Sequence, residues 1–179
     1  ALLDDQFLTA HFLIFCADQN HIFQRVRDHN VGLILPVICI KSQEELEVLM
    51  DALVKTPIKC IEITLRHPFA PKAIEYIKSH YPKITVGAGT IVTSHLLKTA
   101  IKSGADFITS NTFGANDRKI ADCEYSVEEI ITKAIENAKK ATEGTSVKVA
   151  LDIGPIGELL EPVGTLSFDD AYKMFKKQA

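Results

Sequence analysis

Short apolar runs alternate with helical patterns along most of the chain. Nearly every position in each run is apolar, which is typical of strands buried on both faces of a parallel sheet. The segments between the runs carry apolar residues at the three- and four-residue spacing of amphipathic helices. The sequence therefore predicts an α/β fold, a parallel sheet with about five βα units. The expected strands lie at 33–40, 60–65, 84–88, 106–110 and 147–153.

The predicted helices begin at recognisable start signals. A serine followed three residues later by an acidic residue forms a capping box, and proline is favoured in the first helical turn. The strands and helices together occupy residues 31–179, whereas residues 1–30 fit the pattern poorly and are expected to form a partly helical lead-in segment. The signals are Ser42 with Glu45, Pro68 with Pro71, Ser126 with Glu129, and Ser167 with Asp170; a further helix is expected from about Ser94 to Ser103.

Composition and charge narrow the class of protein. The chain has 179 residues, of which 46% are apolar and 24% charged, and its formal net charge is −3. This composition is typical of one globular domain and excludes a disordered or collagen-like chain. A nearly neutral chain also lacks the basic field that attracts nucleic acid or an anionic membrane surface. We therefore expect neither of these as a partner.

The cysteines and the longest apolar stretch point to an intracellular protein. The cysteines are widely spaced and form no Cys-x-x-Cys pair, so we expect buried free thiols rather than disulfides or a metal site. The longest apolar stretch, residues 7–17, is too short to span a bilayer. The sequence therefore predicts a cytoplasmic protein. The cysteines are Cys16, Cys39, Cys60 and Cys123.

Polar residues at the end of the second expected strand are candidates for chemistry. Ligands bind at the carboxyl ends of the strands in parallel α/β sheets. Strand alternation sends Glu62 and Arg66 to one face. A carboxylate among apolar neighbours has a raised pKa suited to a working base, and a guanidinium suits a carboxylate or phosphate. The alternative is an internal ion pair between Glu62 and Arg66.

The third expected strand ends in a glycine-rich turn, Val86-Gly87-Ala88-Gly89-Thr90. Glycines there allow a ligand or a neighbouring backbone to approach closely, and Thr90 adds a hydroxyl. The third glycine of a dinucleotide-binding turn is missing, so the motif alone also fits an ordinary strand-to-helix turn.

Residues 31–108 resemble the KDPG/KHG (2-keto-3-deoxy-6-phosphogluconate / 4-hydroxy-2-oxoglutarate) aldolase family. The matching pieces are the Glu62–Arg66 stretch, the Val86–Thr90 turn and Ser103-Gly104-Ala105-Asp106-Phe107-Ile108. The resemblance implies a class I aldolase on a TIM barrel, without a cofactor, that acts on a small keto-acid substrate and forms a homo-oligomer. It also implies that Glu62 transfers protons, Arg66 holds the substrate carboxylate and Thr90 contacts the keto acid.

The length sets this chain apart from a complete barrel. A closed eight-stranded barrel needs roughly 200–250 residues, so we expect an incomplete TIM-barrel-like sheet. Class I chemistry needs a lysine amine that forms a Schiff base, and the family carries it on a sixth strand. Only Lys148 lies inside an expected strand, at its start, and we do not expect it to act. Binding without turnover is one expected outcome.

Residues 105–179 resemble a second barrel family, the homocysteine S-methyltransferases. The matching pieces are 111–116 (NTFGAN), 151–155 (LDIGP) and 161–166 (EPVGTL). That family holds zinc through paired cysteines, which this chain does not show, so no metal is expected. The resemblance makes Asn111 and Asp152 candidates for lining a pocket; the alternative is that both residues organise loops.

Three functions stay open on the sequence. We favour an aldolase-like lyase that cleaves or binds a small 2-keto-3-deoxy acid. The second possibility is a fragment of a zinc-dependent homocysteine methyltransferase, and the third is a non-catalytic barrel fragment that oligomerises through exposed strand edges. The two resemblances together predict a hybrid of two barrels with a junction near residue 108.

Overall fold

The computed structural model describes residues 35–179, and they contain one parallel sheet of five strands. The strand order in the sheet is the order along the chain, β1-β2-β3-β4-β5, and every neighbouring pair is parallel. This confirms the predicted α/β class. The strands are β1 (Val37–Ile38), β2 (Cys60–Thr64), β3 (Thr85–Gly89), β4 (Phe107–Thr109) and β5 (Lys148–Ala150).

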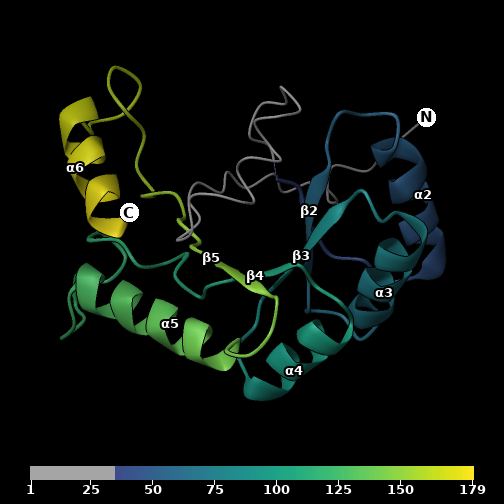
Figure 1. Cartoon of the computed structure of the whole chain (residues 1–179). Helices are drawn as coiled ribbons and strands as arrows, with labels where there is room; N and C mark the ends of the chain where they lie inside the picture. The colour runs from purple at the N-terminus through teal and green to yellow at the C-terminus, as the bar shows by residue number, and fades with distance from the viewer. Residues whose placement is uncertain (1–34) are drawn as a thin grey trace.

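A helix follows each strand, and Figure 1 shows α2 to α5 in an arc around the sheet. The last helix, α6, lies beyond α5, at the end of the arc away from α2 (Figure 1). Because each strand adds to the same edge, the sheet winds in one direction, as in a barrel wall, and does not reverse as a doubly wound sheet does. The helices are α2 (Gln43–Leu53), α3 (Ala70–His80), α4 (Ser94–Lys102), α5 (Val127–Ala141) and α6 (Phe168–Gln178).

The two faces of the sheet carry different chemistry. One row of residues in register across all five strands is apolar, buried and packed into the main hydrophobic core. We call the face of this row the outer face, because α2 to α5 lie around it (Figure 1). The outer row consists of Ile38, Ile63, Ala88, Ile108 and Val149.

The adjacent row lies on the opposite face, which we call the inner face. Its five members are mixed in character and include a carboxylate, a glycine and a lysine. Glu62 is nevertheless almost fully buried, with 4% of its surface exposed. The inner row consists of Val37, Glu62, Gly87, Phe107 and Lys148.

The predicted helices are confirmed, but of the three serine boxes only that of Ser126 is complete. The Ser126 hydroxyl accepts from the Glu129 N–H while the Glu129 carboxylate accepts from the Ser126 N–H, which is a complete capping box. Ser42 also caps its helix, but the Glu45 carboxylate accepts from the N–H of Lys41 instead of that of Ser42. At Ser167, the Asp170 carboxylate accepts from the serine hydroxyl.

The strands are shorter than the apolar runs that predicted them. The first run begins at 33, but β1 begins at Val37, and residues 33 and 34 lie outside the described part of the chain. The last run continues to 153, but β5 ends at Ala150. Apolar residues continue past the ladder there because the loops at the carboxyl ends are packed, as Leu151 at 7% exposed shows. The lead-in segment 1–30 lies outside the described residues.

The cysteine prediction holds only in part. Cys39 and Cys60 are free and partly buried, whereas Cys123 is free and exposed. Cys123 lies in the long loop after β4, where no helix or strand covers it. Cys16 lies outside the described residues. Across 35–179, every helix is too short or too polar to cross a bilayer.

Candidate active site

Glu62 occupies the centre of the inner face. It is the third residue of β2, and β1 and β3 flank it through Val37 and Gly87. Its two neighbours along the strand, Ile61 and Ile63, are fully buried in the core on the outer face. Strand alternation therefore fixes the carboxylate on the inner face. Within the described residues, Oε2 of Glu62 is buried without a hydrogen-bond partner.

Burial changes the acidity of Glu62. Loss of solvent and, to a smaller extent, the negative charge of Asp152 raise its pKa from the ordinary value of 4.5 to about 7. Interaction with the Thr109 hydroxyl and the positive charge of Arg66 lower the pKa and oppose the shift. A carboxyl group with a pKa near 7 can both accept and donate a proton at neutral pH, which general acid–base chemistry requires.

Two glycines in β3 make room for the side chains of Glu62 and Phe107. A Cβ atom built on Gly89 would overlap Oε1 of Glu62, and one built on Gly87 would overlap the ring of Phe107. Both side chains therefore lie across β3, over the main chain of the glycines. The glycine-rich turn predicted from the sequence thus admits two side chains of this chain, and it need not serve a dinucleotide.

Arg66 and Thr90 meet at the rim above Glu62. The Nε atom of Arg66 donates to the hydroxyl of Thr90 at 3.1 Å. Thr90 has a φ of 60°, a left-handed conformation that is unfavourable for a β-branched residue. Such strain is typical of positions where a side chain is held for a function. Arg66 is exposed and makes no ion pair with Glu62 among the described residues, so the internal ion pair considered above is not formed.

Asp152 approaches the site from the loop after β5. Position 152 continues the alternation of Lys148 and Ala150 and so lies on the inner face, just past the carboxyl end of β5. The negative charge of its carboxylate raises the pKa of Glu62. The residue itself is partly buried. The structure therefore brings four of the five predicted site residues to one end of the sheet: Glu62, Arg66, Thr90 and Asp152.

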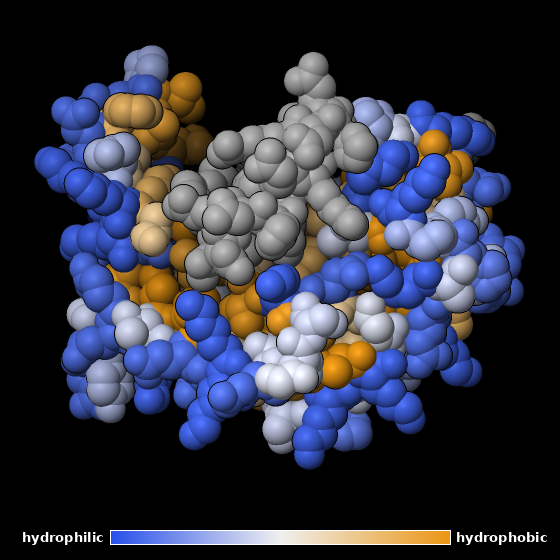
Figure 2. All heavy atoms as spheres, in the orientation of Figure 1, coloured by the Kyte–Doolittle hydropathy of each residue, from blue (hydrophilic) through white to orange (hydrophobic). Residues whose placement is uncertain are grey.

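Asn111 occupies a different place. It is exposed and lines a cavity of about 1070 Å³ between α4 and α5, together with apolar residues such as Leu97 and Ile130. Figure 2 shows hydrophobic atoms at the surface over α5 and over the loop that precedes α6. This cavity opens on the outer side of the sheet, where its lining includes Ile108. The substrate-binding role of Asn111 remains a prediction.

Lys148 shares the inner face of the sheet with Glu62, which its position in the sequence does not indicate. Val149 beside it is buried in the core on the outer face, so the partly buried Lys148 side chain lies on the inner face. Lys148 is in register with Phe107, and through Phe107 and Gly87 it belongs to the same row as Glu62. Lys148 is the first residue of β5, as expected from the sequence, but the strand register puts it on the same inner row as Glu62.

The sequence analysis did not single out Thr109, which interacts with Glu62 in the structure. Thr109 is 5% exposed and lies on the inner face of β4, two residues after Phe107. Its alternation with the outer-face residue Ile108 was readable from the sequence. The row that joins Lys148 to Glu62 depends instead on strand register, which the apolar runs do not specify.

A metal site is not found in the described part of the chain. In residues 35–179, no group of three histidine, cysteine, aspartate or glutamate side chains could hold a metal ion.

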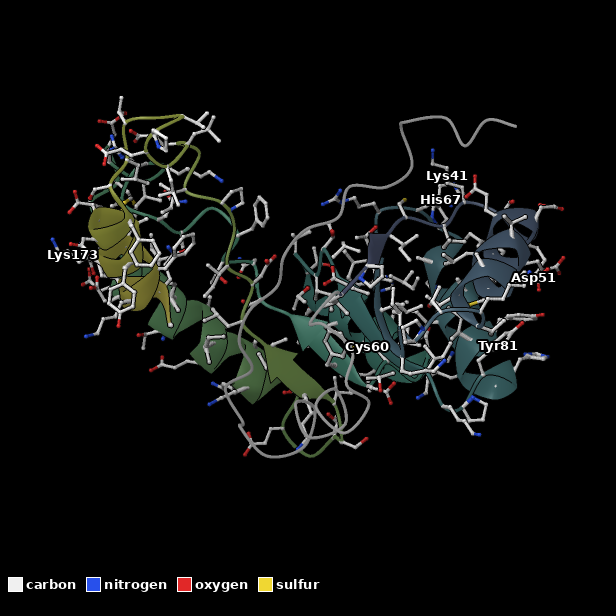
Figure 3. The ribbon with its side chains drawn as sticks, turned by 90° about the horizontal axis from the view of Figure 1, so that it is seen from above. Lys41, Asp51, Cys60, His67, Tyr81 and Lys173 are labelled. Atoms are coloured by element: carbon white, nitrogen blue, oxygen red, sulfur yellow. The ribbon has the colours of Figure 1, made fainter. Side chains whose placement is uncertain are left out.

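Cys60 lies at the start of β2. Figure 3, seen from above, shows it with α2 and α3 on one side and α5 and α6 on the other. Burial raises the pKa of the Cys60 thiol to about 12, helped by the charges of Asp106 and Glu62, so this cysteine stays an inert thiol.

Comparison with known proteins places the chain in a family. The sequence model of the aldolase family described as KDPG and KHG aldolase matches residues 25–154. The chain belongs to this family. The match continues past the expected junction near residue 108, so it gives no support to a junction there. The resemblance of the later residues to homocysteine methyltransferases stays a prediction.

Individual members of the aldolase family are similar over part of their length. The 2-dehydro-3-deoxy-phosphogluconate aldolases of Haemophilus influenzae and Zymomonas mobilis are 30% and 34% identical to this chain over 121 residues, which are 68% of this chain and 53% of each relative. The KHG/KDPG aldolase of Escherichia coli is 35% identical over 79 residues, 44% of this chain and 37% of that protein. The chain thus spans about half the length of the curated aldolases it matches.

A solved aldolase structure also aligns with this chain. The KDPG aldolase from Legionella pneumophila, with pyruvate captured as a covalent carbinolamine intermediate, is 22% identical with a TM-score of 0.46. The alignment covers 80% of this chain and 53% of that one.

Proposed function

We propose that this aldolase-family chain binds a small 2-keto acid at the inner face and performs class I aldolase chemistry on it. The observation that carries the proposal is Glu62, a buried carboxyl group with an unpartnered oxygen and a pKa of about 7 at the carboxyl end of a parallel sheet. A side chain this costly to bury is uncommon unless a ligand or a reaction uses it. Membership of the aldolase family supports the same assignment.

Arg66 is the proposed carboxylate-binding group. Its Nε atom is engaged with Thr90, which orients the guanidinium at the rim. The terminal nitrogens make no ion pair with a described residue and present the planar fork that suits a carboxylate. A keto acid held there by its carboxylate would extend its carbonyl toward Glu62.

Lys148 is the proposed Schiff-base amine. The strand register places it on the same inner row as Glu62, three strands away, which is roughly 14 Å along a flat sheet at ordinary strand spacing. A lysine side chain, a small keto acid and a glutamate side chain together span such a distance. No other described lysine belongs to a strand.

The proposed reaction balances with these groups. The amine of Lys148 adds to the ketone carbon to give a carbinolamine. Protonated Glu62 donates a proton to the carbinolamine hydroxyl, which leaves as water, so that a protonated imine and the Glu62 carboxylate remain. Cleavage of the carbon–carbon bond gives an enamine and an aldehyde once a base removes the proton of the substrate hydroxyl. Glu62 is placed to accept that proton and to return it to the enamine carbon, since its pKa lies near 7.

Reductive trapping tests this proposal. Incubation with pyruvate and borohydride should fix one reduced pyruvate on the chain, and peptide mapping should locate it at Lys148. Lys148→Met should lose the adduct. Lys173→Met is the matched control, because Figure 3 shows Lys173 on α6, away from the sheet, and this variant should keep the adduct. An adduct confined to surface lysines, or none, would overturn the assignment of Lys148.

The sheet edges support self-association. Among residues 35–179, β1 and β5 each pair with a strand on one side only. Unpaired strand edges are templates for pairing with another chain. We therefore propose a homo-oligomer, whether or not the chain turns over substrate. Sedimentation at several protein concentrations should show species larger than the monomer, and a monomer at all of them would contradict this part of the proposal.

A further inference from the structure

Two hydroxyl groups close a ring of hydrogen bonds with the main chain of Asp152. The N–H of Asp152 donates to Oγ of Ser110 at 3.0 Å, and the hydroxyl of Thr112 donates to the carbonyl oxygen of Asp152 at 2.6 Å. The two hydroxyl oxygens lie 2.6 Å apart. Because the Thr112 proton is already used on Asp152, the Ser110 hydroxyl is the donor between them. We call Ser110 and Thr112 the hydroxyl clamp.

The clamp is buried and every proton in it is used. Ser110 is 6% exposed and Thr112 1% exposed. A buried hydroxyl without a partner is costly, so a closed ring in which each group donates once is a stable arrangement. Its effect is to fix both main-chain polar groups of one residue, Asp152, which lies about forty positions further along the chain.

Other contacts between the same two loops support this arrangement. The N–H of Ser110 donates to the carbonyl of Ala150 at 2.9 Å, which extends the β4–β5 pairing to the clamp. A Cβ atom built on Gly154 would overlap the carbonyl oxygen of Phe113, so the loops after β4 and β5 are in close contact. The main chain is therefore held in place both before Asp152, at Ala150, and after it, at Gly154.

The fixed residue carries a charge that acts on Glu62. Among the described residues, three charged or titratable groups act on Glu62: Cys60 on β2, Arg66 in the loop after β2, and Asp152 in the loop after β5. Lys148 lies on the same row, three strands away. The residues of β3 and β4 that face Glu62 are glycines, Phe107 and Thr109, which are uncharged. Asp152 is the carboxylate among the groups that act on Glu62, and it favours the protonated form.

We propose that Asp152 is a positioning residue for proton transfer at Glu62, and that the hydroxyl clamp acts through it by fixing its main chain at the carboxyl end of β5. The proposal deepens the proposed function, because it assigns the groups that hold Glu62 ready to exchange a proton at neutral pH. It also gives the loop after β4 a role, since two of its buried residues form the clamp.

Titration of Glu62 in the full chain tests the first part. The pKa can be followed through the side-chain carboxyl carbon by NMR, without any substrate. Asp152→Asn removes the charge, and we expect the pKa of Glu62 to fall by roughly 0.5–1 unit, because a nearby negative charge favours the protonated form of a carboxyl group. Asp51→Asn is the matched control, because Asp51 lies on α2, away from the sheet in Figure 3, and should leave the pKa unchanged.

Variants of the clamp test the second part. Thr112→Val keeps the shape of the side chain but removes the hydroxyl, and it should lower the pKa of Glu62 toward the value in Asp152→Asn. Adding Thr112→Val to Asp152→Asn should produce little further change, because both act through one carboxylate. Thr112→Ser keeps the hydroxyl and should therefore keep the pKa of Glu62 unchanged. If the valine variant does not fold, the serine variant still tests whether the hydroxyl is sufficient.

The outcomes separate this inference from the proposed function. If the pKa of Glu62 is the same in Asp152→Asn as in the unchanged chain, the positioning role of Asp152 is overturned, even where pyruvate is trapped normally. If Thr112→Val lowers only the stability and leaves the pKa unchanged, the clamp is merely structural. If the pKa values move as expected but no pyruvate adduct forms, the inference stands and the Schiff-base proposal fails.

Discussion

The outer and inner faces of the same strands follow opposite rules. On the outer face, residues such as Ile61, Ile63 and Val86 have no exposed surface and pack against helices. On the inner face, the intervening positions hold Glu62 and Thr64, which are buried polar residues, and two glycines, which make room for the side chains of Glu62 and Phe107. The difference indicates that the outer face stabilises the fold, and it supports our proposal that the inner face binds a keto acid.

The largest expected effect is on the outer face. Ile63→Ala removes a fully buried side chain from the middle of β2 and should lower the free energy of unfolding by roughly 2–5 kcal/mol. Ile63→Val, which removes one methylene, should cost only about 0.5–1.5 kcal/mol. Urea denaturation measures both, and equal small losses in the two variants would contradict the assignment of this face to the core.

The next largest effect is expected from Glu62 on the inner face, where a substitution should stabilise the fold instead of destabilising it. Because the pKa of Glu62 is raised from 4.5 to about 7, its contribution to stability is complete below pH 4.5 and is lost as the pH rises through 7. Glu62→Gln removes this titration. The free energy of unfolding of the variant, minus that of the unchanged protein, should therefore be up to about 3 kcal/mol more favourable at pH 8 than at pH 4. Denaturation of both proteins across this pH range measures the difference, and a constant gap would contradict it.

Gly89→Ala on the inner face should destabilise the fold and disturb the position of Glu62. The added methyl group would overlap Oε1 of Glu62, so the carboxylate must move, at a cost of about 1–3 kcal/mol in the free energy of unfolding. Pyruvate trapping should weaken in the same variant. Combining the change with Glu62→Ala should relieve the overlap, and a loss of stability that persists in the double variant would show that the carboxylate is not the obstacle.

The smallest expected effect concerns the strained rim. Thr90→Gly removes the penalty of a left-handed φ of 60° and should stabilise the fold by about 1 kcal/mol, although Arg66 loses its hydroxyl partner. Pyruvate should bind more weakly to this variant, which calorimetry can measure. Thr90→Ser, which keeps the hydroxyl, should retain binding; equal affinities in all three proteins would remove Thr90 from the site.

The contrast between the faces was largely readable from the sequence. Alternation along β2 predicted that Glu62 and Arg66 share a face, because a two-residue period follows directly from strand geometry. The helix starts at Ser126 and Ser167 were also correct, since capping is a local interaction. These features depend on residues only a few positions apart.

Long-range features could not be predicted. The place of Lys148 on the same inner row as Glu62 depends on the register of four strands. The apolar run that contains Lys148 is also longer than the strand it forms. The hydroxyl clamp joins residues about forty positions apart, and nothing in the spacing of Ser110 and Thr112 indicates that Asp152 is their partner. Such pairings become visible only when the chain is folded.

The most direct test of the account is the titration of Glu62 itself, with and without pyruvate. The account predicts a pKa of about 7 for the free protein and a change in the Glu62 carboxyl signal when pyruvate is added. A pKa near 4.5 together with an unchanged signal would mean that Glu62 is an ordinary solvated carboxylate, and the assignment of the inner face to keto-acid chemistry would be wrong.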